Sequence, residues 1–551
     1  MTTSTATLVR FTQRPDHSLV LGLSATRAIT LAACVLAVAI VTVASGMTAG
    51  VITAIGISPL AGSALLMVEG RALIEWTPDA ARYVWRGANG RLRVLANPDR
   101  PVPAGILPIP GTVQQLAVFA AVDGSAVLHD SATDTWTAIA AVTGNGFLYA
   151  DAETQDAATA GFGRTLAAIG SDGQIQRIHI IHRTRAHIWN AEPETSDPLR
   201  QMCCSSMADE PDRISNLADG QTETGGEASI RSEIDSAAMT PGPRMSAGTE
   251  VHRVDAARDG NEDAQVAGAA VAAYRETLGQ FRSAWRHETL LAITLGGKTS
   301  RAAIRRAGHG RTAAARVLAA HRAGLAETLD SAGTGLEEWL TPADLADWII
   351  DSFDPASIPL RHDGPANARP RGPSGSADRT ASAGPMAVDE TWSTVRTDSA
   401  WHQVLWVSGW PRFDTHPAFL APVILPAGAI VTVSLVYEPI PTPVALRQIG
   451  RDKTAQASDA ALRRRIGTLD TAEQAARESD TLQRETEIAE GHLDMRHTAL
   501  IAITAATRDE LGDAATRIRQ VAAAAGCETR ILYGQQLAAL NATILPAGVR
   551  L

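Results

Sequence analysis

Residues 28–68 read AITLAACVLAVAIVTVASGMTAGVITAIGISPLAGSALLMV and contain no charged side chain. As a single helix this stretch would be about 60 Å long, roughly twice the hydrocarbon thickness of a bilayer. Folded back near Gly46, it supplies two segments of about 20 residues, each long enough to span. We therefore predict a transmembrane hairpin with Gly46 and Gly50 at its turn. Pro59 and Gly62 are expected to interrupt the second span, which membrane helices tolerate.

Two other interpretations of this stretch are a signal peptide and a buried helical pair in a soluble core. A signal peptide has a short apolar core, a cleavage site and polar sequence after it. The tripeptide Ala-Ser-Gly at 44–46 resembles such a site, but a second apolar span follows. The charges that flank the stretch argue against a soluble core.

Arginines on both flanks predict the orientation of the hairpin. Lys and Arg near the ends of spans stay on the cytoplasmic side. We therefore expect both termini, and nearly the whole chain, on the cytoplasmic side of a bacterial inner membrane. The flanking residues are Arg10, Arg14 and Arg27 before the hairpin, and Arg71, Arg82, Arg86, Arg91 and Arg93 after it.

Composition excludes some classes of function. The chain has 551 residues and a net charge of −10, so its bulk charge does not suit nucleic-acid binding. Its only lysines are Lys298 and Lys453, a bias typical of GC-rich bacterial genomes. Cys34, Cys203, Cys204 and Cys527 form neither a disulfide framework nor a zinc spacing. A redox role for the vicinal pair is the alternative to an inert pair.

The pattern along the chain predicts a membrane-anchored α+β protein whose cytoplasmic domains have a ferredoxin-like or related fold. No repeat of fixed period is evident. The expected divisions are a cytoplasmic lead 1–27, the hairpin 28–68, a juxtamembrane surface segment 69–104, an α+β module 105–190, a disordered insertion 191–262, a mainly helical module 263–361, a linker 362–388 and an α+β module 389–551 with a C-terminal β-α-β unit.

Local signals predict individual elements within these divisions. Thr77-Pro78 opens a helix, with Trp76, Tyr83 and Trp85 as anchors in the headgroup layer. An ordinary amphipathic helix of the soluble domain is the alternative. Asp123-Gly124 marks a β-hairpin, Asp151 caps a helix, and Thr341-Pro342 opens another. Helical pattern also resumes at Ala264, and a long polar helical region runs from ALRQIGRDKT to ETEIAEG.

The strongest enzyme-like motif is AITLGGKT, which ends at Gly297-Lys298-Thr299. It resembles the end of a phosphate-binding loop, which needs a glycine where this chain has Ala292. Ala292 lies inside the apolar run LLAITL, so we interpret the motif as a strand followed by a Gly-Gly turn. A nucleotide site that uses Lys298 is kept as the alternative.

Other candidate sites have weaker patterns. Gly161 and Gly163, before Arg164, do not define a dinucleotide site. His179, His182 and His187 suggest a metal cluster, but residues three apart on a strand point to opposite faces. His182 should share a face with Ile178 and Ile180, and His179 should share the other with the arginines at 177, 183 and 185. We expect the charges of these arginines to be solvated, with contact to a partner or a nucleic acid as the alternative.

Glu487, Glu490 and His492 could form an acid–base group, although a solvated helix end is the simpler interpretation. We therefore assign no catalytic, cofactor-binding or metal-binding residue, and expect no enzymatic activity and no cofactor.

The order of these blocks resembles the N-terminal, non-motor region of the type IV secretion ATPase of conjugation systems. The front of the chain, with its spanning hairpin and Glu75-Trp76, is similar to the small two-span membrane subunit that partners that ATPase. The chain is similar to a family of actinobacterial conjugation-associated membrane proteins that fuse both parts and lack the motor. The fragments that carry the resemblance are DGSAVL, QIQRIHIIHRTRAHIW, LTPADLADWI, IVTVSLVYEPIP, ALRQIGRDKTAQASD, RETEIAEGHLDMRHTALIAITAATRDELGDAATRI and ILYGQQLAALNATIL.

This resemblance implies a non-catalytic scaffold subunit of a conjugative type IV-like secretion system, involved in DNA transfer or protein secretion. Its expected partners are a separate secretion ATPase, other membrane subunits, membrane lipids and copies of itself, with no small-molecule substrate. A membrane subunit of a type VII-like secretion system remains an alternative, because it too carries a two-span hairpin before a cytoplasmic domain.

Overall fold

The computed structural model describes most of the chain outside the two polar regions. All described residues belong to one compact unit. The predicted insertion 191–262, the helix expected from Ala264, Cys203-Cys204 and the linker up to residue 379 lie outside the described residues. The described residues are 9, 11, 18–20, 23–96, 102–111, 116–144, 146–147, 150–171, 173–187, 284–331, 334–358, 380–425, 428–467 and 471–546.

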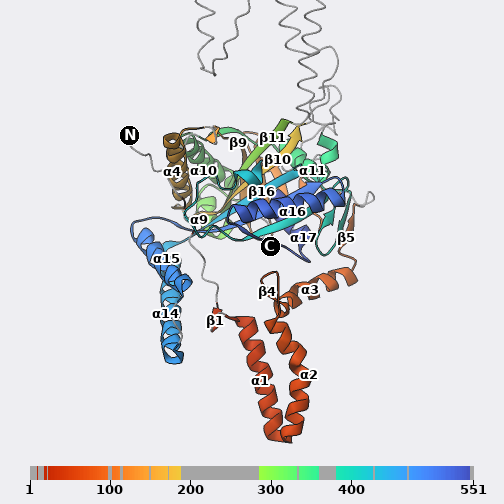
Figure 1. Ribbon diagram of the computed structural model, residues 1–551. Helices are drawn as coiled ribbons and strands as arrows, with labels where there is room; N and C mark the ends of the chain where they lie inside the picture. The colour runs from red at the N-terminus through yellow and green to blue at the C-terminus, as the bar shows by residue number, and fades with distance from the viewer. Residues whose placement is uncertain are drawn as a thin grey trace, which may run out of the picture. The chain divides into compact units, whose positions relative to one another are not determined.

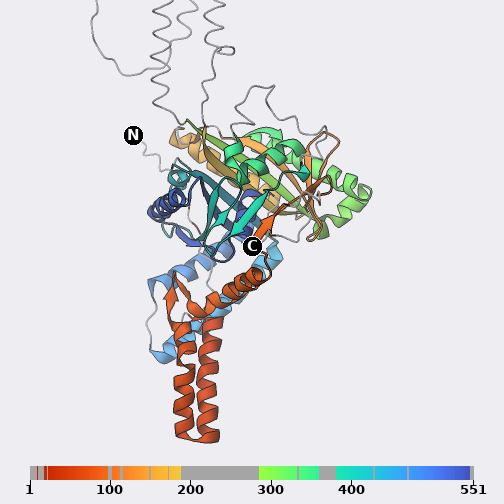
Figure 2. The same ribbon diagram turned by 90° about the vertical axis from the view of Figure 1, so that its right-hand side faces the viewer.

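Two apolar helices form the predicted hairpin, α1 (Ala25–Ser45) and α2 (Met47–Leu65), which run side by side in Figures 1 and 2. Gly46 joins them with φ 88°, a conformation that suits glycine. Their mean hydropathies are 2.5 and 1.5, and only 6% and 11% of the two apolar windows is buried. Both helices can therefore span a membrane, and neither is the core helix of a soluble fold.

Two details of the hairpin differ from the prediction. Gly50 lies inside α2 rather than in the turn, at a close contact between the helices, because a Cβ there would lie 2.0 Å from Thr42 Oγ1. Pro59 and Gly62 do not interrupt α2, which is one continuous helix. Small residues allow membrane helices to approach closely, so Gly50 has a packing role.

The chain leaves the hairpin through β3 (Met67–Val68) and β4 (Arg71–Ala72) and enters α3 (Leu73–Ala88). Helix α3 therefore begins before the predicted Thr77-Pro78 start. The Glu75 carboxylate accepts from the Ala72 N–H at 3.3 Å, which caps the earlier start. Pro78 has no N–H to offer the Ile74 carbonyl, and the Thr77 hydroxyl donates to it instead at 2.7 Å.

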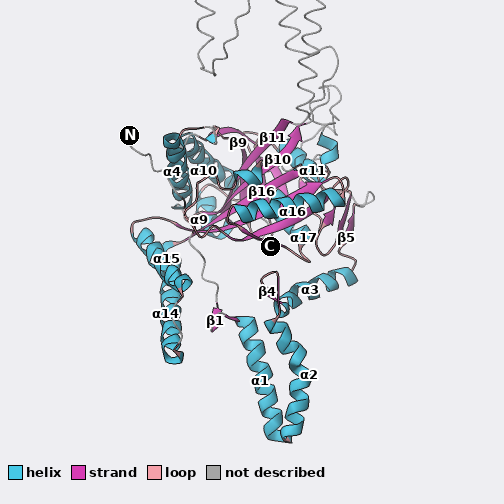
Figure 3. Cartoon of the chain, in the orientation of Figure 1, coloured by secondary structure: helices cyan, strands magenta, loops and turns pink. Residues whose placement is uncertain are grey.

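The body is built on one large antiparallel sheet, drawn in magenta in Figure 3. Its strand order is β5-β13-β14-β15-β17-β16-β10-β11-β9-β8-β7-β6, with β12 beside β9 and β18 beside β15. Strands from the ranges 105–190, 263–361 and 389–551, predicted as separate modules, thus share one sheet. The strands are β5 (Arg93–Leu95), β6 (Ile106–Leu107), β7 (Leu116–Ala120), β8 (Ala126–Asp130), β9 (Thr135–Thr143), β10 (Ile175–His187), β11 (Ala284–Gly296), β12 (Gly335–Trp339), β13 (Ala387–Glu390), β14 (Val395–Arg396), β15 (Trp401–Gly409), β16 (Ile430–Ile440), β17 (Asp494–Ala505) and β18 (Glu528–Ile531).

The sheet contains two structural repeats that the sequence did not reveal. In the first repeat the strands lie in the order β12-β9-β11-β10, and in the second they lie in the order β18-β15-β17-β16. Register is shared as well: Thr294 faces Thr137 in the first repeat, as Thr504 faces His402 in the second. Strands β10 and β16 join the repeats edge to edge.

Helices cover both faces of the sheet. On one face α4, α9 and α10 pack on the first repeat and α13 and α16 on the second. On the other face α11 and α17 share one core, and Trp348 Nε1 donates to the Ile544 carbonyl at 2.9 Å. The helices are α4 (Ala152–Ser171), α9 (Gly297–Arg306), α10 (Arg311–Ser331), α11 (Pro342–Phe353), α13 (Ala421–Ile424), α16 (Arg508–Ala524) and α17 (Gln536–Ile544).

Several local predictions are confirmed. Strands β7 and β8 form the hairpin around Gly124, Asp151 Oδ1 accepts from the Thr154 N–H at 2.8 Å, and Thr341 caps α11. The long polar region is a pair of packed helices, α14 (Thr442–Ile466) and α15 (Ala472–Ala489), inserted between β16 and β17. Gly467 ends α14 with φ 76°.

Candidate functional site

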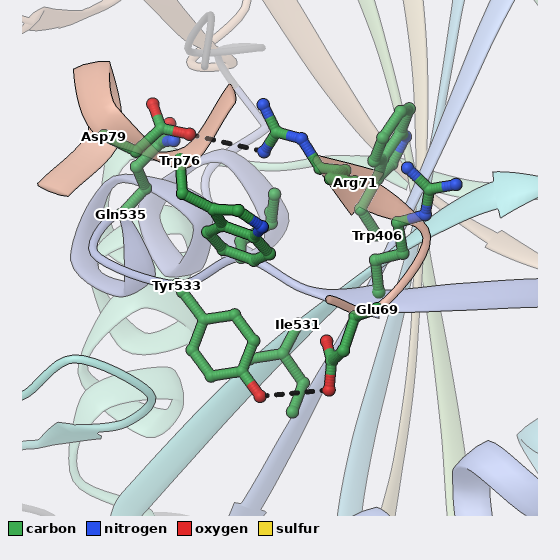
Figure 4. A pocket seen from close by; sticks show the side chains of 10 residues that line it. Glu69, Arg71, Trp76, Asp79, Trp406, Ile531, Tyr533 and Gln535 are labelled. Atoms are coloured by element: carbon green, nitrogen blue, oxygen red, sulfur yellow. Dashed lines mark hydrogen bonds and ion pairs between the residues drawn. The ribbon is translucent and has the colours of Figure 1, made fainter. Parts of the chain in front are cut away.

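The strongest candidate site is the junction at which the membrane hairpin meets the body. A cleft of about 340 Å³, including the solvent at its mouth, lies between the β3–β4 turn, α3 and the end of the second repeat. Figure 4 shows its side chains converging from both sides. Its lining residues are Glu69, Arg71, Trp76, Asp79, Trp406, Arg530, Ile531, Leu532, Tyr533 and Gln535.

The turn between β3 and β4 places the first side chains of the cleft. Glu69 and Gly70 form a two-residue loop, with φ 49° and 75°. Positive φ at both positions is what a tight antiparallel hairpin requires, and it is unusual for a residue with a Cβ such as Glu69. The loop is held in place because Glu69 accepts a hydrogen bond from the Tyr533 hydroxyl at 3.2 Å.

One face of α3 packs on the body. The Trp76 ring meets the Tyr533 ring edge-on at 5.3 Å, and the Tyr83 ring meets Trp392 at 5.0 Å. These positions are seven residues apart, two turns of one helix face. Both rings were predicted as headgroup anchors, and that prediction is wrong for them because each ring packs edge-on against an aromatic side chain of the body.

Arg86 makes the strongest polar contact on this face of α3. Its Nη1 lies 2.7 Å from Glu390 Oε2, and no part of the Glu390 side chain is exposed. Glu390 also accepts from the Leu537 N–H at 3.2 Å. Burial raises the pKa of Tyr83, and the charge of Glu390 raises it further. The anchor is therefore joined to the body by a buried ion pair as well as by rings.

The opposite face of α3 has large apolar side chains without cover. Val84 is 67% exposed and Trp85 is 58% exposed, and the Arg91 guanidinium lies over the Trp85 ring at 5.1 Å. This face fits the predicted membrane-surface helix, with Trp85 as the remaining aromatic anchor.

The chain before the hairpin also contacts the second repeat. Val9 forms an antiparallel bridge with Thr415. The Phe11 ring stacks on Trp410 at 4.9 Å and meets Phe419 edge-on at 5.3 Å. Both flanks of the hairpin are thus attached to the same body.

The charges of the cleft are partly paired. Arg71 and Arg82 lie 3.3 and 3.8 Å from the Asp79 carboxylate, and Arg519 lies 4.0 Å from Glu69. Burial raises the pKa of Tyr533, and Glu69 raises it further. The arrangement has no nucleophile next to a base, and it suits binding and coupling rather than bond cleavage.

Lys298 lies in an ordinary strand-to-helix connection. It is exposed in the first turn of α9. A Cβ on Gly297 would lie 2.4 Å from the Asp134 carboxylate, so an acidic side chain occupies the space where a phosphate would approach. The second repeat makes the same connection at Arg508 without the glycines. The expected strand is present, but the expected Gly-Gly turn is not, because Gly296 ends β11 and Gly297 begins α9.

His179 and His182 do not converge, as the alternation of side chains along the strand predicted. His179 Nε2 lies 2.7 Å from Ser434 Oγ, and His182 Nδ1 lies 2.8 Å from Thr289 Oγ1, on the opposite face of β10. Burial lowers the pKa of His179 to about 3 and that of His182 to about 4, with nearby Arg177 and His287 adding to the two shifts. The His187 side chain lies outside the described part. Within that part, no three His, Cys, Asp or Glu side chains could hold a metal.

The arginines of β10 are buried, which corrects the prediction that their charge is solvated. Arg177, Arg183 and Arg185 are 7%, 3% and 2% exposed. Arg183 and Arg185 both reach Glu288, at 2.7 and 3.1 Å. Burial alone would raise the pKa of Glu288, but the two arginines outweigh it and hold this pKa at about 2. An edge or surface strand would have left these charges in water, whereas β10 is central and covered by α11.

The remaining candidates are ordinary parts of the fold. Gly161, Gly163 and Arg164 lie within helix α4 rather than in a loop. Glu490 and His492 are exposed at the end of α15, where Glu487 accepts from Gln483 at 2.9 Å. Cys34 and Cys527 are buried free thiols, and burial raises the pKa of Cys527 to about 11.

No protein-family model matches this chain, and no curated protein matches it.

Proposed function

We propose that this protein is a membrane-anchored, non-catalytic scaffold subunit of a conjugative type IV-like secretion system, which docks a separate secretion ATPase on its body. The observation that carries the proposal is that both flanks of the hairpin are attached to one body, through Phe11 and through Arg86. A rigid joint of this kind suits a subunit that holds a partner at a membrane.

The strand order of each repeat supports a ferredoxin-like fold. Numbered along the chain, the strands β9, β10, β11 and β12 lie in the order 4-1-3-2, and so do β15, β16, β17 and β18. Helices connect the first to the second strand and the third to the fourth, as in a β-α-β-β-α-β unit. The body would then be two such units, joined through β10 and β16.

The orientation is part of the same proposal. Because Val9 and α3 contact the same body, the two flanks of the hairpin lie on one side of the membrane. The arginines of both flanks support the cytoplasm as that side. The body therefore faces the cytoplasm, with only the turn near Gly46 reaching the other side of the inner membrane.

Affinity capture of the full chain from detergent-solubilised membranes of its own host tests the proposal. A secretion ATPase or a coupling protein should be recovered with it. The Arg86→Ala variant, with α3 loosened from the body, should recover less, whereas Arg93→Ala should recover as much as the wild type. Captures that never contain a secretion ATPase or coupling protein overturn the proposal.

A type VII-like membrane subunit is a second candidate, because its hairpin before a cytoplasmic body would give the same front half. The genes beside this one distinguish the two machines. Nucleotide hydrolysis through Lys298 is a third, and the Asp134 carboxylate beside Gly297 argues against it. Nucleotide binding by the wild type that Lys298→Ala abolishes would revive it.

A further inference from the structure

The junction cleft contains polar donors that no protein group satisfies. Trp76 Nε1 is buried and has no hydrogen-bond partner. Among the described residues, no carboxylate lies within ion-pair distance of Arg530, which lines the same cleft. A buried N–H without a partner costs free energy, and a guanidinium group offers a fork of N–H donors suited to oxyanions.

The local backbone keeps the Arg530 guanidinium in this place. A Cβ on Gly70 would lie 3.3 Å from Arg530 Nη2, and Gly70 has φ +75°. Glycine therefore satisfies both the turn and the close approach of the guanidinium group. Arg530 comes from β18 in the second repeat, and Gly70 comes from the turn that leaves the hairpin.

The balance of charge in the cleft favours an anion. Its two carboxylates, Glu69 and Asp79, are each already engaged by arginine. Arg71 and Arg530 line the cleft with the two carboxylates, and Arg82 and Arg519 pair with those carboxylates from outside the lining, so four guanidinium groups surround two carboxylates.

The cleft begins where the apolar chain of the second span ends. Leu65, Leu66 and Met67 are 60%, 60% and 59% exposed, and Val68 is 46% exposed. Glu69, the first residue of the cleft, follows directly. A bilayer that contains α2 would bring its headgroups to this position, where tryptophan and arginine are also typical.

We propose that this cleft binds the phosphate of an anionic phospholipid headgroup. The Arg530 guanidinium takes two phosphate oxygens, the Trp76 indole N–H donates to one of them, and the lipid tails continue along the exposed end of α2. The bound lipid would fill the joint between anchor and body.

Native mass spectrometry of the full chain in detergent tests this site. The probes are phosphatidylglycerol and, as the zwitterionic reference, phosphatidylcholine. The wild type should retain phosphatidylglycerol in preference. Arg530→Gln should lower the affinity for phosphatidylglycerol about tenfold, because the variant loses a charge-assisted bidentate contact. Trp76→Phe, which keeps the ring on Tyr533, should lower it about threefold.

Arg305→Gln is the matched control, because Arg305 is exposed on α9 and does not line the cleft. It should retain phosphatidylglycerol as the wild type does. Equal retention by wild type, Arg530→Gln and Trp76→Phe overturns the proposal. Competition with millimolar inorganic phosphate distinguishes a lipid phosphate from free phosphate as the bound group. If the lipid stays bound, the result supports binding of the lipid headgroup. If the lipid is displaced, the cleft binds free phosphate and the proposal is overturned.

Discussion

The two repeats of the body share strand order and register, yet their side chains at equivalent positions differ in chemical type. In the first repeat Glu288 pairs across the strands with Arg183; Arg183 is 3% exposed and the Glu288 side chain is partly exposed. In the second repeat the equivalent pair is Thr498 and Val436. Backbone hydrogen bonding and alternate burial define the sheet, so the same frame can hold an ion pair or an uncharged pair.

The repeats also differ in their neighbours. The contacts that hold both flanks of the hairpin come from the second repeat and the strands before it, through Trp410, Trp392, Glu390 and Tyr533. The first repeat instead carries the buried arginines and α11. The second repeat, with the strands before it, therefore attaches the body to the hairpin, and the first repeat does not share those contacts.

The largest expected effect comes from breaking the ion pairs of the first repeat. Glu288→Ala removes the carboxylate that buried Arg183 and Arg185 share and leaves Arg183 only the Asp351 carboxylate at 3.9 Å, which should lower the free energy of unfolding by about 3–5 kcal/mol. Thr498→Ala, the equivalent change in the second repeat, should cost about 1 kcal/mol. Denaturant unfolding of the full chain in detergent measures both, and equal losses would contradict the assigned roles.

The joint between anchor and body comes next. Arg86→Ala leaves the buried Glu390 carboxylate without its arginine and should lower the free energy of unfolding by about 3 kcal/mol. This value is at the low end for a buried pair because Arg86 is partly exposed. Arg93→Ala removes an exposed pair with Asp389 and should cost about 0–1 kcal/mol. Limited proteolysis between α3 and the body should accelerate for the first variant alone.

The hairpin offers a matched pair of glycines. Gly50→Val forces a side chain against Thr42 and should destabilise the packing of α1 on α2 by about 1–3 kcal/mol. Gly56→Val meets nothing within 4 Å and should leave the packing unchanged. Distances between spin labels on the two helices would show the difference, and a broadened distribution for Gly56→Val would argue against this contact.

Exchanging residues between the repeats tests the pH dependence. Burial lowers the pKa of His179 and of His402 to about 3, so between pH 6.5 and 3 the unfolded chain binds protons that the folded chain does not. Stability must therefore fall as the pH falls through this window, by about 1.4 kcal/mol per pH unit for each histidine.

The residues at the equivalent positions are Thr432 and Thr137. His179→Thr and His402→Thr should each make the free energy of unfolding depend less steeply on pH, whatever their effect on that free energy at pH 7. Free energies of unfolding at pH 7 and pH 5 measure it, and an unchanged slope in both variants would show that other groups dominate acid unfolding.

The smallest expected effect is at the strand-to-helix connections. Lys298→Ala and its counterpart Arg508→Ala replace exposed side chains at the start of a helix, and each should change stability by less than about 0.5 kcal/mol. A loss of several degrees in melting temperature for Lys298→Ala alone would point to a role that the repeat does not explain.

Much of the local structure was predictable. The apolar run, the capping residues Asp151 and Thr341, and the turn at Gly124 report short-range physics, and each lies where expected. The start of α3 was not predictable, because Pro78 reads as a helix start unless Thr77 is seen to satisfy the Ile74 carbonyl.

The sequence by itself determined the two apolar helices, the strands and the caps, because length, hydropathy and period are properties of neighbouring residues. Only the tertiary structure decided that the strands form two joined repeats, that the arginines of β10 are buried, and that Trp76 and Tyr83 face the body. Those outcomes depend on pairings between residues hundreds of positions apart, such as Arg86 with Glu390. Strand order leaves no local signal, because every strand alternates in the same way whichever neighbour it finds.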